Sequence, residues 1–290
     1  MEHKLIELYC LICQIYDNHL VLKYQRLSNF KPKFSDEELL TCYFFGLMQK
    51  YHEQRAIFDY IQQHWRDCFP ALPSYQAFNR RFNNLSPAFE IIIDELLIDK
   101  LPSGDLTNDS VLDSFPVMIA KGKQAKRSQI ASEIADFGFC ASKQIYYHGI
   151  KLHALAVRRI RKLPVPFIFS LSKSSTHDLT AFKELNCQLP SGILFADKAY
   201  SDTEIKDHLQ VTGVTLLTPQ KRKRNESVFQ TEPLWSRFVS SFRQPIESFF
   251  KWLIVKTDFQ NASRVRSTNG LLVHCFGKLA FACLLICFYS

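Results

Sequence analysis

The hydrophobic rhythm of the chain changes near residue 105, and this change limits the possible folds more than any other feature. Before it, apolar residues recur at helical spacing. Ser35 and Glu38 form a capping box there, ahead of a helix with an apolar face. After it, short extended runs alternate with helical segments. We therefore expect a helical domain over residues 1–105 and a second, α/β domain over residues 106–290.

The N-terminal region contains two further helical patterns, at about residues 53–65 and 74–85. Ser74 caps the second of these, whose non-apolar face carries Gln76, Asn79, Arg80 and Asn83. Gln and Asn can pair with adenine edges in the major groove, and Arg with guanine edges. Three short helices that end in a polar, basic one are typical of a helix-turn-helix. An ordinary solvated helix face explains the same residues equally well.

Five extended runs are predicted after residue 105. They cover residues 111–117, 144–157, 165–171, 192–197 and 213–218. Helices are expected near residues 176–189, after a cap formed by Ser201 and Glu204, and over the remainder of the chain. Strand runs followed by βαβ units predict a mixed five-stranded sheet flanked by helices.

Three carboxylates occupy positions that call for a partner. Asp113 lies within an apolar run, Asp197 ends another, and Glu247 falls in the first turn of a helix after Pro245. A buried carboxylate must be paired, hydrogen-bonded or bound to a cation. Together the three would form an all-oxygen site suited to two Mg²⁺ or Mn²⁺ ions and to in-line phosphoryl transfer. Spacing alone does not single them out among 28 acidic residues, and Asp109 is the natural decoy for Asp113.

The chain carries 36 Lys and Arg residues against 28 Asp and Glu residues, a formal net charge of +8 that indicates an anionic partner. Basic runs flank the predicted strands. They comprise Lys121, Lys123, Lys126 and Arg127; Arg158, Arg159, Arg161 and Lys162; and Lys221, Arg222, Lys223 and Arg224. A basic run is usually a solvated loop, but three runs around one carboxylate site favour phosphate contacts. Lys151 and His153 share the non-apolar face of the second run and could face either this site or solvent.

The C-terminal segment, residues 271–289, is strongly apolar but is interrupted by His274 and Lys278. We expect a buried terminal helix there rather than a membrane anchor. The nine cysteines are odd in number and show no disulfide framework, which favours a reducing cytoplasm.

Several segments of the chain occur in an order typical of one family. They are LPSYQAFNRRF, VLDSFPV, YYHGIKLHALA, SKSSTHDLTAF, LFADKAYSD and RQPIESFFKWL. This ordered set resembles the DDE transposases of bacterial insertion sequences, most closely the insertion sequence 982 family. The resemblance implies a ribonuclease H-like core whose metal-binding catalytic triad is Asp113, Asp197 and Glu247. It also implies binding to terminal inverted repeats, cleavage at the element ends, joining of the 3′-hydroxyl ends to target DNA, and at least a dimer when two ends are paired.

A related branch of these transposases carries a Tyr-Arg-Glu-Lys box around the glutamate. Arg243 matches its Arg, but Ser240 stands in place of Tyr and Ile254 in place of Lys. Lys251 and Lys256 are candidate substitutes for that Lys. The predicted DNA contacts are Gln76, Asn79, Arg80, Asn83, Lys121, Lys123, Arg127, Lys151, Lys221, Arg222, Arg243 and Lys251. Two alternatives stay open, namely a structure-specific nuclease without strand transfer and a catalytically silent DNA-binding regulator.

Overall fold

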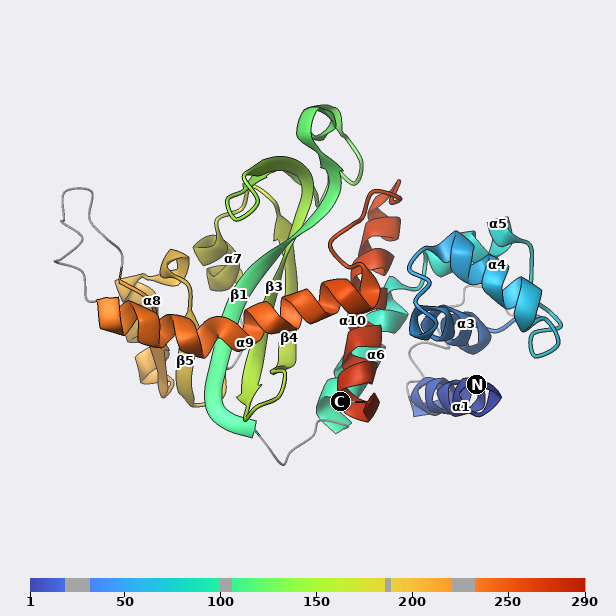
Figure 1. The fold of residues 1–290 in the computed structure, drawn as a ribbon, viewed down its shortest axis with the longest axis horizontal. Coiled ribbons are helices and arrows are strands. Elements are labelled where there is room, and N and C mark those ends of the chain that lie inside the picture. The colour runs from blue at the N-terminus through green and yellow to red at the C-terminus, as the bar shows by residue number, and fades with distance from the viewer. Residues whose placement is uncertain (19–31, 100–105, 186–188, 221–232, 290) are drawn as a thin grey trace. The chain divides into compact units, whose positions relative to one another are not determined.

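The structure is a computed structural model that describes residues 1–18, 32–99, 106–185, 189–220 and 233–289 (Figure 1). The chain divides into two compact units. Unit 1 comprises Met1–Lys100, Val255–Phe259 and Asn269–Ser290, and unit 2 comprises Leu101–Ile254 and Gln260–Thr268. The division differs from the expected one because the C-terminal helix and the short segment Val255–Phe259 group with the N-terminal helices rather than with the α/β domain.

The described part of unit 1 is helical. Its elements are α1 (Glu2–Asn18), α3 (Asp36–Met48), α4 (Gln54–His64), α5 (Tyr75–Phe82), α6 (Ser86–Asp99) and most of α10 (Thr268–Tyr289). The predicted capping box of α3 is confirmed, since the Glu38 amide donates to Ser35 Oγ at 3.1 Å and the Ser35 amide donates to Glu38 Oε2 at 2.6 Å. Ser74 caps α5 as predicted.

The aromatic core of unit 1 explains why α10 belongs to it. Phe281 of α10 stacks on Phe44 of α3 with ring centroids 6.2 Å apart. Gly277 lies against the Tyr43 ring, where an added Cβ would approach to 3.0 Å. By length and hydropathy α10 could cross a membrane, but 67% of its most apolar window is buried inside the structure. The helix is therefore the buried terminal helix that the sequence predicts.

Unit 2 is built on a six-stranded sheet, one strand more than predicted. Its strands are β1 (Leu106–Lys121), β2 (Asp136–Cys140), β3 (Ile145–Arg159), β4 (Val165–Lys173), β5 (Gly192–Ala196) and β6 (Val214–Leu217). Strands β1, β2 and β4 pair with β3 in antiparallel fashion, whereas β1–β5 and β5–β6 are parallel. The order β2-β3-β1-β5-β6 places β1 at the centre.

The extra strand β2 was not predicted because its local sequence is short and carries Asp136 and Gly138, which disfavour strands. Tertiary pairing overrides this preference. β2 pairs with Ile145–Gly149 of β3, beside the part of β3 that pairs with β4. Gly138 is required there, because a Cβ would lie only 2.7 Å from the carbonyl oxygen of Ser174.

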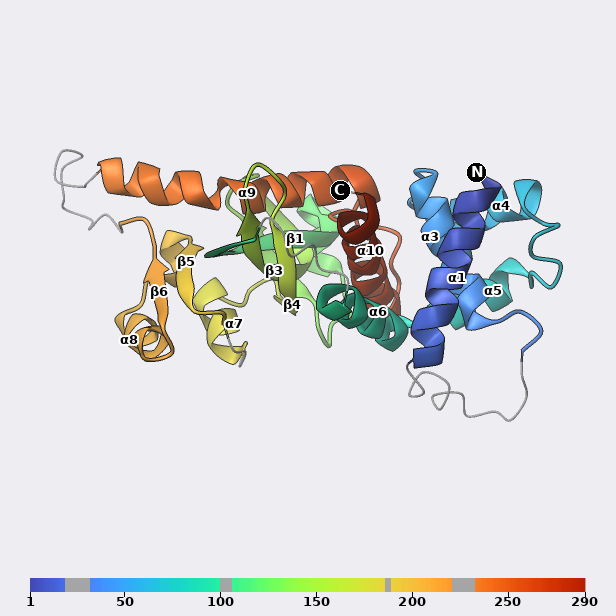
Figure 2. The same cartoon turned by 90° about the horizontal axis from the view of Figure 1, so that it is seen from below.

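Helices cover both faces of the sheet, as Figure 2 shows. They are α7 (Asp178–Glu184), α8 (Thr203–Val211) and α9 (Pro233–Thr257). Phe250 of α9 stacks on Phe115 of β1 with centroids 5.1 Å apart. Leu112 of the same strand belongs instead to the core cluster that includes Ile205 and Leu209 of α8. Because successive side chains of a strand point to opposite faces, α9 and α8 lie on opposite sides of β1.

Two helix starts differ from the prediction. The cap of α8 is Asp202 rather than Ser201, with the Ile205 amide donating to Asp202 Oδ1 at 3.0 Å. α7 begins later and ends earlier than expected, and His177 is its N-terminal cap.

Candidate active site

Asp113 and Asp197 come from adjacent parallel strands. Leu112 of β1 pairs with Ala196 of β5, so the two aspartates are the next residues along each strand. Asp197 directly follows β5 and precedes a single 3-10 turn, Lys198–Tyr200. The two aspartates, 84 residues apart in sequence, are thus brought together by the register of two short strands.

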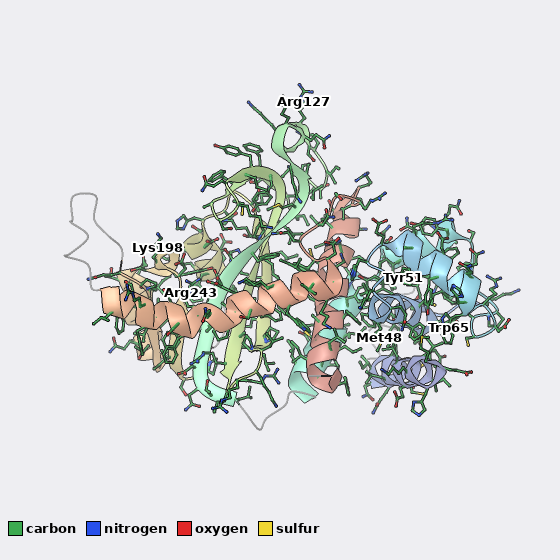
Figure 3. All side chains as sticks on the ribbon, in the orientation of Figure 1. Met48, Tyr51, Trp65, Arg127, Lys198 and Arg243 are labelled. Atoms are coloured by element: carbon green, nitrogen blue, oxygen red, sulfur yellow. The ribbon has the colours of Figure 1, made fainter. Side chains whose placement is uncertain are left out.

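Arg243 of α9 joins the two carboxylates. Its Nη2 lies 2.8 Å from Asp113 Oδ2, and its Nη1 lies 3.5 Å from Asp197 Oδ1. The Arg243 side chain is only 11% exposed, and Figure 3 labels it where α9 crosses the sheet. The Ser114 amide donates to the other Asp113 oxygen, Oδ1, at 2.8 Å. Both oxygens of Asp113 are therefore engaged.

Burial dominates the electrostatics of this pair. Burial raises the pKa of Asp113 to about 6, against the opposing effects of Arg243 and the Ser114 amide, and the nearby Asp197 charge raises it further. The Asp113 side chain is 18% exposed and that of Asp197 is 37% exposed, so the pair is reached from solvent through Asp197. A bound cation would favour the ionised form of both carboxylates.

Glu247 lies on α9 four residues after Arg243, and its side chain is exposed. Residues at this spacing lie on the same side of a helix. In the described ranges no three His, Cys, Asp or Glu side chains are grouped closely enough to hold a metal ion. The structure therefore brings together two of the three predicted ligands and places the third on the helix that carries their arginine. The all-carboxylate donor set fits Mg²⁺ or Mn²⁺.

The decoy carboxylate Asp109 has a different partner. Arg158 of β3 pairs with it, with Nη1 2.8 Å from Asp109 Oδ2, and the same guanidinium lies over the Phe242 ring at 4.4 Å. This pairing separates Asp109 from the Asp113–Asp197 pair, a distinction that residue spacing could not make.

The predicted base-reading face of α5 is accessible. Gln76 and Arg80 are exposed, whereas Asn79 and Asn83 are half-buried and hydrogen-bond each other at 3.4 Å. Arg81 is turned inward and pairs with Asp36 at 2.5 Å.

The predicted phosphate contacts of unit 2 divide into accessible and engaged residues. Lys121, Lys123 and Arg127 are exposed at the outer end of β1 and on η1 (Gly122–Arg127), and Lys251 is exposed on α9. Lys151 is instead engaged within the unit, since its Nζ donates to Asp178 Oδ1 at 3.0 Å and to the Thr176 carbonyl at 2.7 Å. Lys221 and Arg222 lie outside the described residues.

His153 shares the buried setting of Lys151. Its Nε2 lies 2.7 Å from Ser172 Oγ, and burial lowers its pKa to about 4. Of the two settings that the sequence left open, His153 therefore lies inside unit 2 and does not face solvent.

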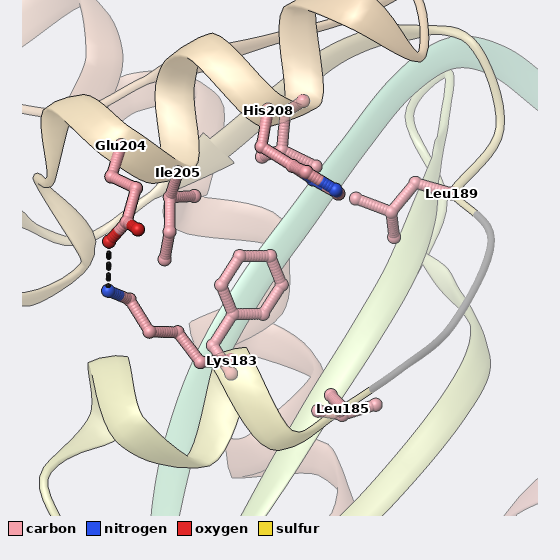
Figure 4. A pocket seen from close by; sticks show the side chains of 8 residues that line it. Lys183, Leu185, Leu189, Glu204, Ile205 and His208 are labelled. Atoms are coloured by element: carbon pink, nitrogen blue, oxygen red, sulfur yellow. Dashed lines mark hydrogen bonds and ion pairs between the residues drawn. The ribbon is translucent and has the colours of Figure 1, made fainter.

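A cavity of about 320 Å³ lies between α7 and α8 (Figure 4). Lys183 and Glu204 pair across it at 2.9 Å, and the rest of its lining is mainly apolar. Neither Asp113 nor Asp197 lines it, and α8 lies on the face of β1 opposite α9. The cavity is therefore separate from the carboxylate pair.

A family model described as a transposase DDE domain matches residues 103–268, more than half of the chain. The chain belongs to this family. No curated protein and no solved structure gives a significant match. The curled mixed sheet of unit 2, with helices on both faces, fits the ribonuclease H-like core of a DDE transposase. Membership indicates a DNA-cleaving and strand-transferring enzyme, and DDE transposase domains generally use divalent metal ions.

Proposed function

We propose that the chain is the transposase of a bacterial insertion sequence of the 982 family. It would bind the terminal inverted repeats in the cytoplasm, cleave DNA at the element ends and join the 3′-hydroxyl ends to target DNA. The observation that carries this proposal is the Asp113–Arg243–Asp197 cluster, formed by two neighbouring parallel strands and one helix inside the matched transposase domain. Asp113 and Asp197 both lie within 3.5 Å of the Arg243 guanidinium. This arrangement favours a site in which metal ions replace the guanidinium as the partner of the two carboxylates.

In this proposal Asp113, Asp197 and Glu247 hold two Mg²⁺ or Mn²⁺ ions. Such ions supply activation of the attacking oxygen and stabilisation of the leaving oxygen in a phosphoryl displacement. Asp113 and Asp197 are fixed by the sheet, whereas Glu247 approaches from the exposed side of α9. Arg243, once it is released from the carboxylates, would neutralise a DNA phosphate at the same place.

DNA recognition is divided between the two units in this proposal. Gln76, Asn79, Arg80 and Asn83 of α5 would contact base edges in the inverted repeats. Lys121, Lys123, Arg127 and Lys251 of unit 2 are the exposed cations that would contact phosphates. Pairing of two ends requires at least a dimer during synapsis.

The test uses the full chain and DNA duplexes that end in the inverted repeats flanking its gene. Asp197→Asn should abolish cleavage and joining while end binding stays nearly unchanged. Asp207→Asn, which removes an exposed carboxylate from the nearby α8, is the matched control and should retain both activities. Retained Mg²⁺-dependent cleavage in Asp197→Asn would overturn the triad.

The same assay separates the two alternatives. Cleavage without joining by the unaltered chain would indicate a structure-specific nuclease. Binding to the ends with no metal-dependent cleavage would indicate a regulator. Short inverted repeats bounded by a small direct duplication around the gene would support the transposase.

A further inference from the structure

The hairpin formed by β2 and β3 exposes three aromatic side chains on one face. Phe137, Phe139 and Tyr146 are 41%, 45% and 54% exposed, respectively. Phe139 is directly paired with Tyr146, and Phe137 with His148, so the three aromatics share a face. The ring centroids of Phe137 and Tyr146 are 5.3 Å apart with the planes at 4°, and those of Phe139 and Tyr146 are 4.8 Å apart. We call these three residues the aromatic hairpin face.

The opposite face of the hairpin already anchors it to unit 2. Cys140 and Tyr147 are buried there in a cluster with Met118. The Asp136 side chain at the start of β2 also accepts hydrogen bonds from Ser174 Oγ at 2.8 Å and from the Ser175 amide at 2.9 Å. Cross-strand aromatic pairs do add to hairpin stability. Because the buried face holds the hairpin in place, however, the aromatic hairpin face is a rigid apolar surface presented to solvent.

Exposed cations lie near the aromatic hairpin face. Lys121 pairs in register with Tyr147, and the 3-10 helix η1 follows it directly. The segment after η1 reaches the aromatic side of the hairpin, because the Ile130 carbonyl lies 2.8 Å from Nε2 of His148, whose side chain shares the face of Tyr146 and Phe137. Four cationic residues lie at the end of β1 and on η1, namely Lys121, Lys123, Lys126 and Arg127. All four are exposed, and the ion pairs between described residues include none of them. Figure 1 shows η1 at the outer end of β1, and Figure 3 labels Arg127 there.

A stacked aromatic surface beside exposed cations has the chemistry of a single-strand binding site. Bases stack on aromatic rings whatever their sequence, while Lys and Arg hold the adjacent phosphates. Bases paired within a duplex cannot offer their faces to such a surface. The cations also favour a polyanion over an apolar protein surface.

We infer that the aromatic hairpin face binds unpaired bases of a DNA strand, with Lys123, Lys126 and Arg127 of η1 contacting its phosphates. This inference rests on the proposed function in one respect, because nicking near the element ends would supply strands that can unpair. The binding itself needs neither metal ions nor the carboxylate cluster, so it can be measured separately.

The test measures fluorescence anisotropy of a labelled single-stranded oligothymidine with the full chain in EDTA. Tyr146→Leu should weaken binding by roughly 5- to 150-fold, the range for loss of one stacked base. Tyr146→Trp should retain wild-type affinity because stacking is preserved. The matched control Tyr9→Leu, at a 39% exposed aromatic residue of α1, should leave affinity unchanged. Lys123→Ala combined with Lys126→Ala should weaken binding and reduce its salt dependence.

A second measurement covers the case in which Tyr146→Leu does not fold. Fluorescence of 2-aminopurine placed within the oligonucleotide should be quenched by the unaltered chain, and less so by Phe139→Leu. Wild-type affinity in a folded Tyr146→Leu protein, or absence of quenching by the unaltered chain, would overturn the inference. So would loss of self-association by Tyr146→Leu with unchanged DNA binding, which would make the face a contact between copies of the chain.

The outcomes also separate this inference from the proposed function. Asp197→Asn should bind the oligothymidine normally, because Asp197 is not part of the aromatic hairpin face. If the unaltered chain binds single strands through Tyr146 but never cleaves end DNA, only the proposed function fails. If it cleaves and joins ends but Tyr146→Leu binds single strands normally, only the inference fails.

Discussion

Arg243 Nη2 lies 2.8 Å from Asp113 Oδ2, and this contact makes a guanidinium the counterion of the central carboxylate of the sheet. The second contact of Arg243, to Asp197 at 3.5 Å, is longer and more exposed. The stability of this part of unit 2 therefore depends on one cation that binds mainly to Asp113.

Removing the Arg243 guanidinium should show whether the Asp113–Asp197 pair binds Mg²⁺. We expect Arg243→Met to lower the free energy of unfolding by up to about 3 kcal/mol in EDTA, the lower end of the range for breaking a buried pair. Mg²⁺ should then raise the melting temperature of Arg243→Met more than that of the unaltered chain, because the ion no longer competes with the guanidinium. Thermal unfolding followed by circular dichroism, with and without Mg²⁺, measures both effects.

Arg158→Met is the matched control, since Arg158 pairs with Asp109 at the same 2.8 Å, although its side chain is 21% exposed against 11% for Arg243. It should also be destabilised, but with no added response to Mg²⁺. Equal Mg²⁺ responses in the two variants would show that the Asp113–Asp197 pair is not a selective cation site.

The two aspartates of β1 should differ in their effect on activity. Asp113→Asn should abolish Mg²⁺-dependent cleavage of end DNA, because the oxygen held by Arg243 is lost as a metal ligand. Asp109→Asn should retain cleavage and lose only the stability of its pair with Arg158. A gel-based cleavage assay together with melting temperatures distinguishes them, and the reverse pattern would show that Asp109 is the ligand.

Substitution of the two adjacent arginines of α5 should have different effects, Arg80 on DNA recognition and Arg81 on stability. Arg80 is exposed, so Arg80→Ala should lose about 1–3 kcal/mol of discrimination at one base pair of the inverted repeat with little change in melting temperature. Arg81 donates to the Phe34 carbonyl and to Asp36, so Arg81→Ala should mainly lower stability. Competition binding with single-base variants of the repeat measures the first effect. A uniform loss on all sequences would make Arg80 a phosphate contact.

Lys278 should make the stability of unit 1 depend on pH. It is 3% exposed, and burial lowers its pKa from 10.5 to about 8, against opposing effects of Asp258, Cys275 and Glu53. Between pH 8 and 10.5 the unfolded chain holds a proton that the folded chain has lost, so the contribution of Lys278 to stability rises with pH through this window. Relative to the unaltered chain, Lys278→Met should be more stable at pH 7 by at most about 3 kcal/mol.

This advantage should shrink toward pH 10.5, as measured by denaturant unfolding. Methionine also forfeits the hydrogen bond that Lys278 Nζ donates to the Asp258 carbonyl at 3.0 Å, which reduces the gain. A difference between the two proteins that is independent of pH would contradict the lowered pKa.

The elements with strong local signals could be predicted from the sequence. The capping box of α3 and the Ser74 cap of α5 are confirmed because each depends on residues three apart. β2 was missed because its stability comes from pairing with β3 and from the contact of Gly138 with Ser174, neither of which is local. The grouping of α10 with the N-terminal helices has the same cause, since Phe44 and Phe281 are far apart in sequence.

The site was predictable to a similar degree. Strand ends and residue order favoured Asp113 and Asp197, and their common register follows from the pairing of β1 with β5. The partners of charged residues were not predictable. Helical spacing placed Arg80 rather than Arg81 on the polar face of α5, but nothing in the local sequence shows that Arg81 pairs with Asp36, or that Lys151 is held by Asp178 while Lys123 is exposed.

Because unit 1 is made of segments from both ends of the chain, its core cannot be completed until translation is nearly finished. Its core combines helices from the first hundred residues with α10, and the whole of unit 2 is translated between them. At typical elongation rates this interval is on the order of ten seconds. During it, Phe44 and Tyr43 lack the surface that Phe281 and Gly277 later provide. A ribosome that stops within unit 2 would therefore release a chain whose first helices cannot complete their core, and such a fragment would be a substrate for chaperones and proteases rather than a competing DNA-binding protein.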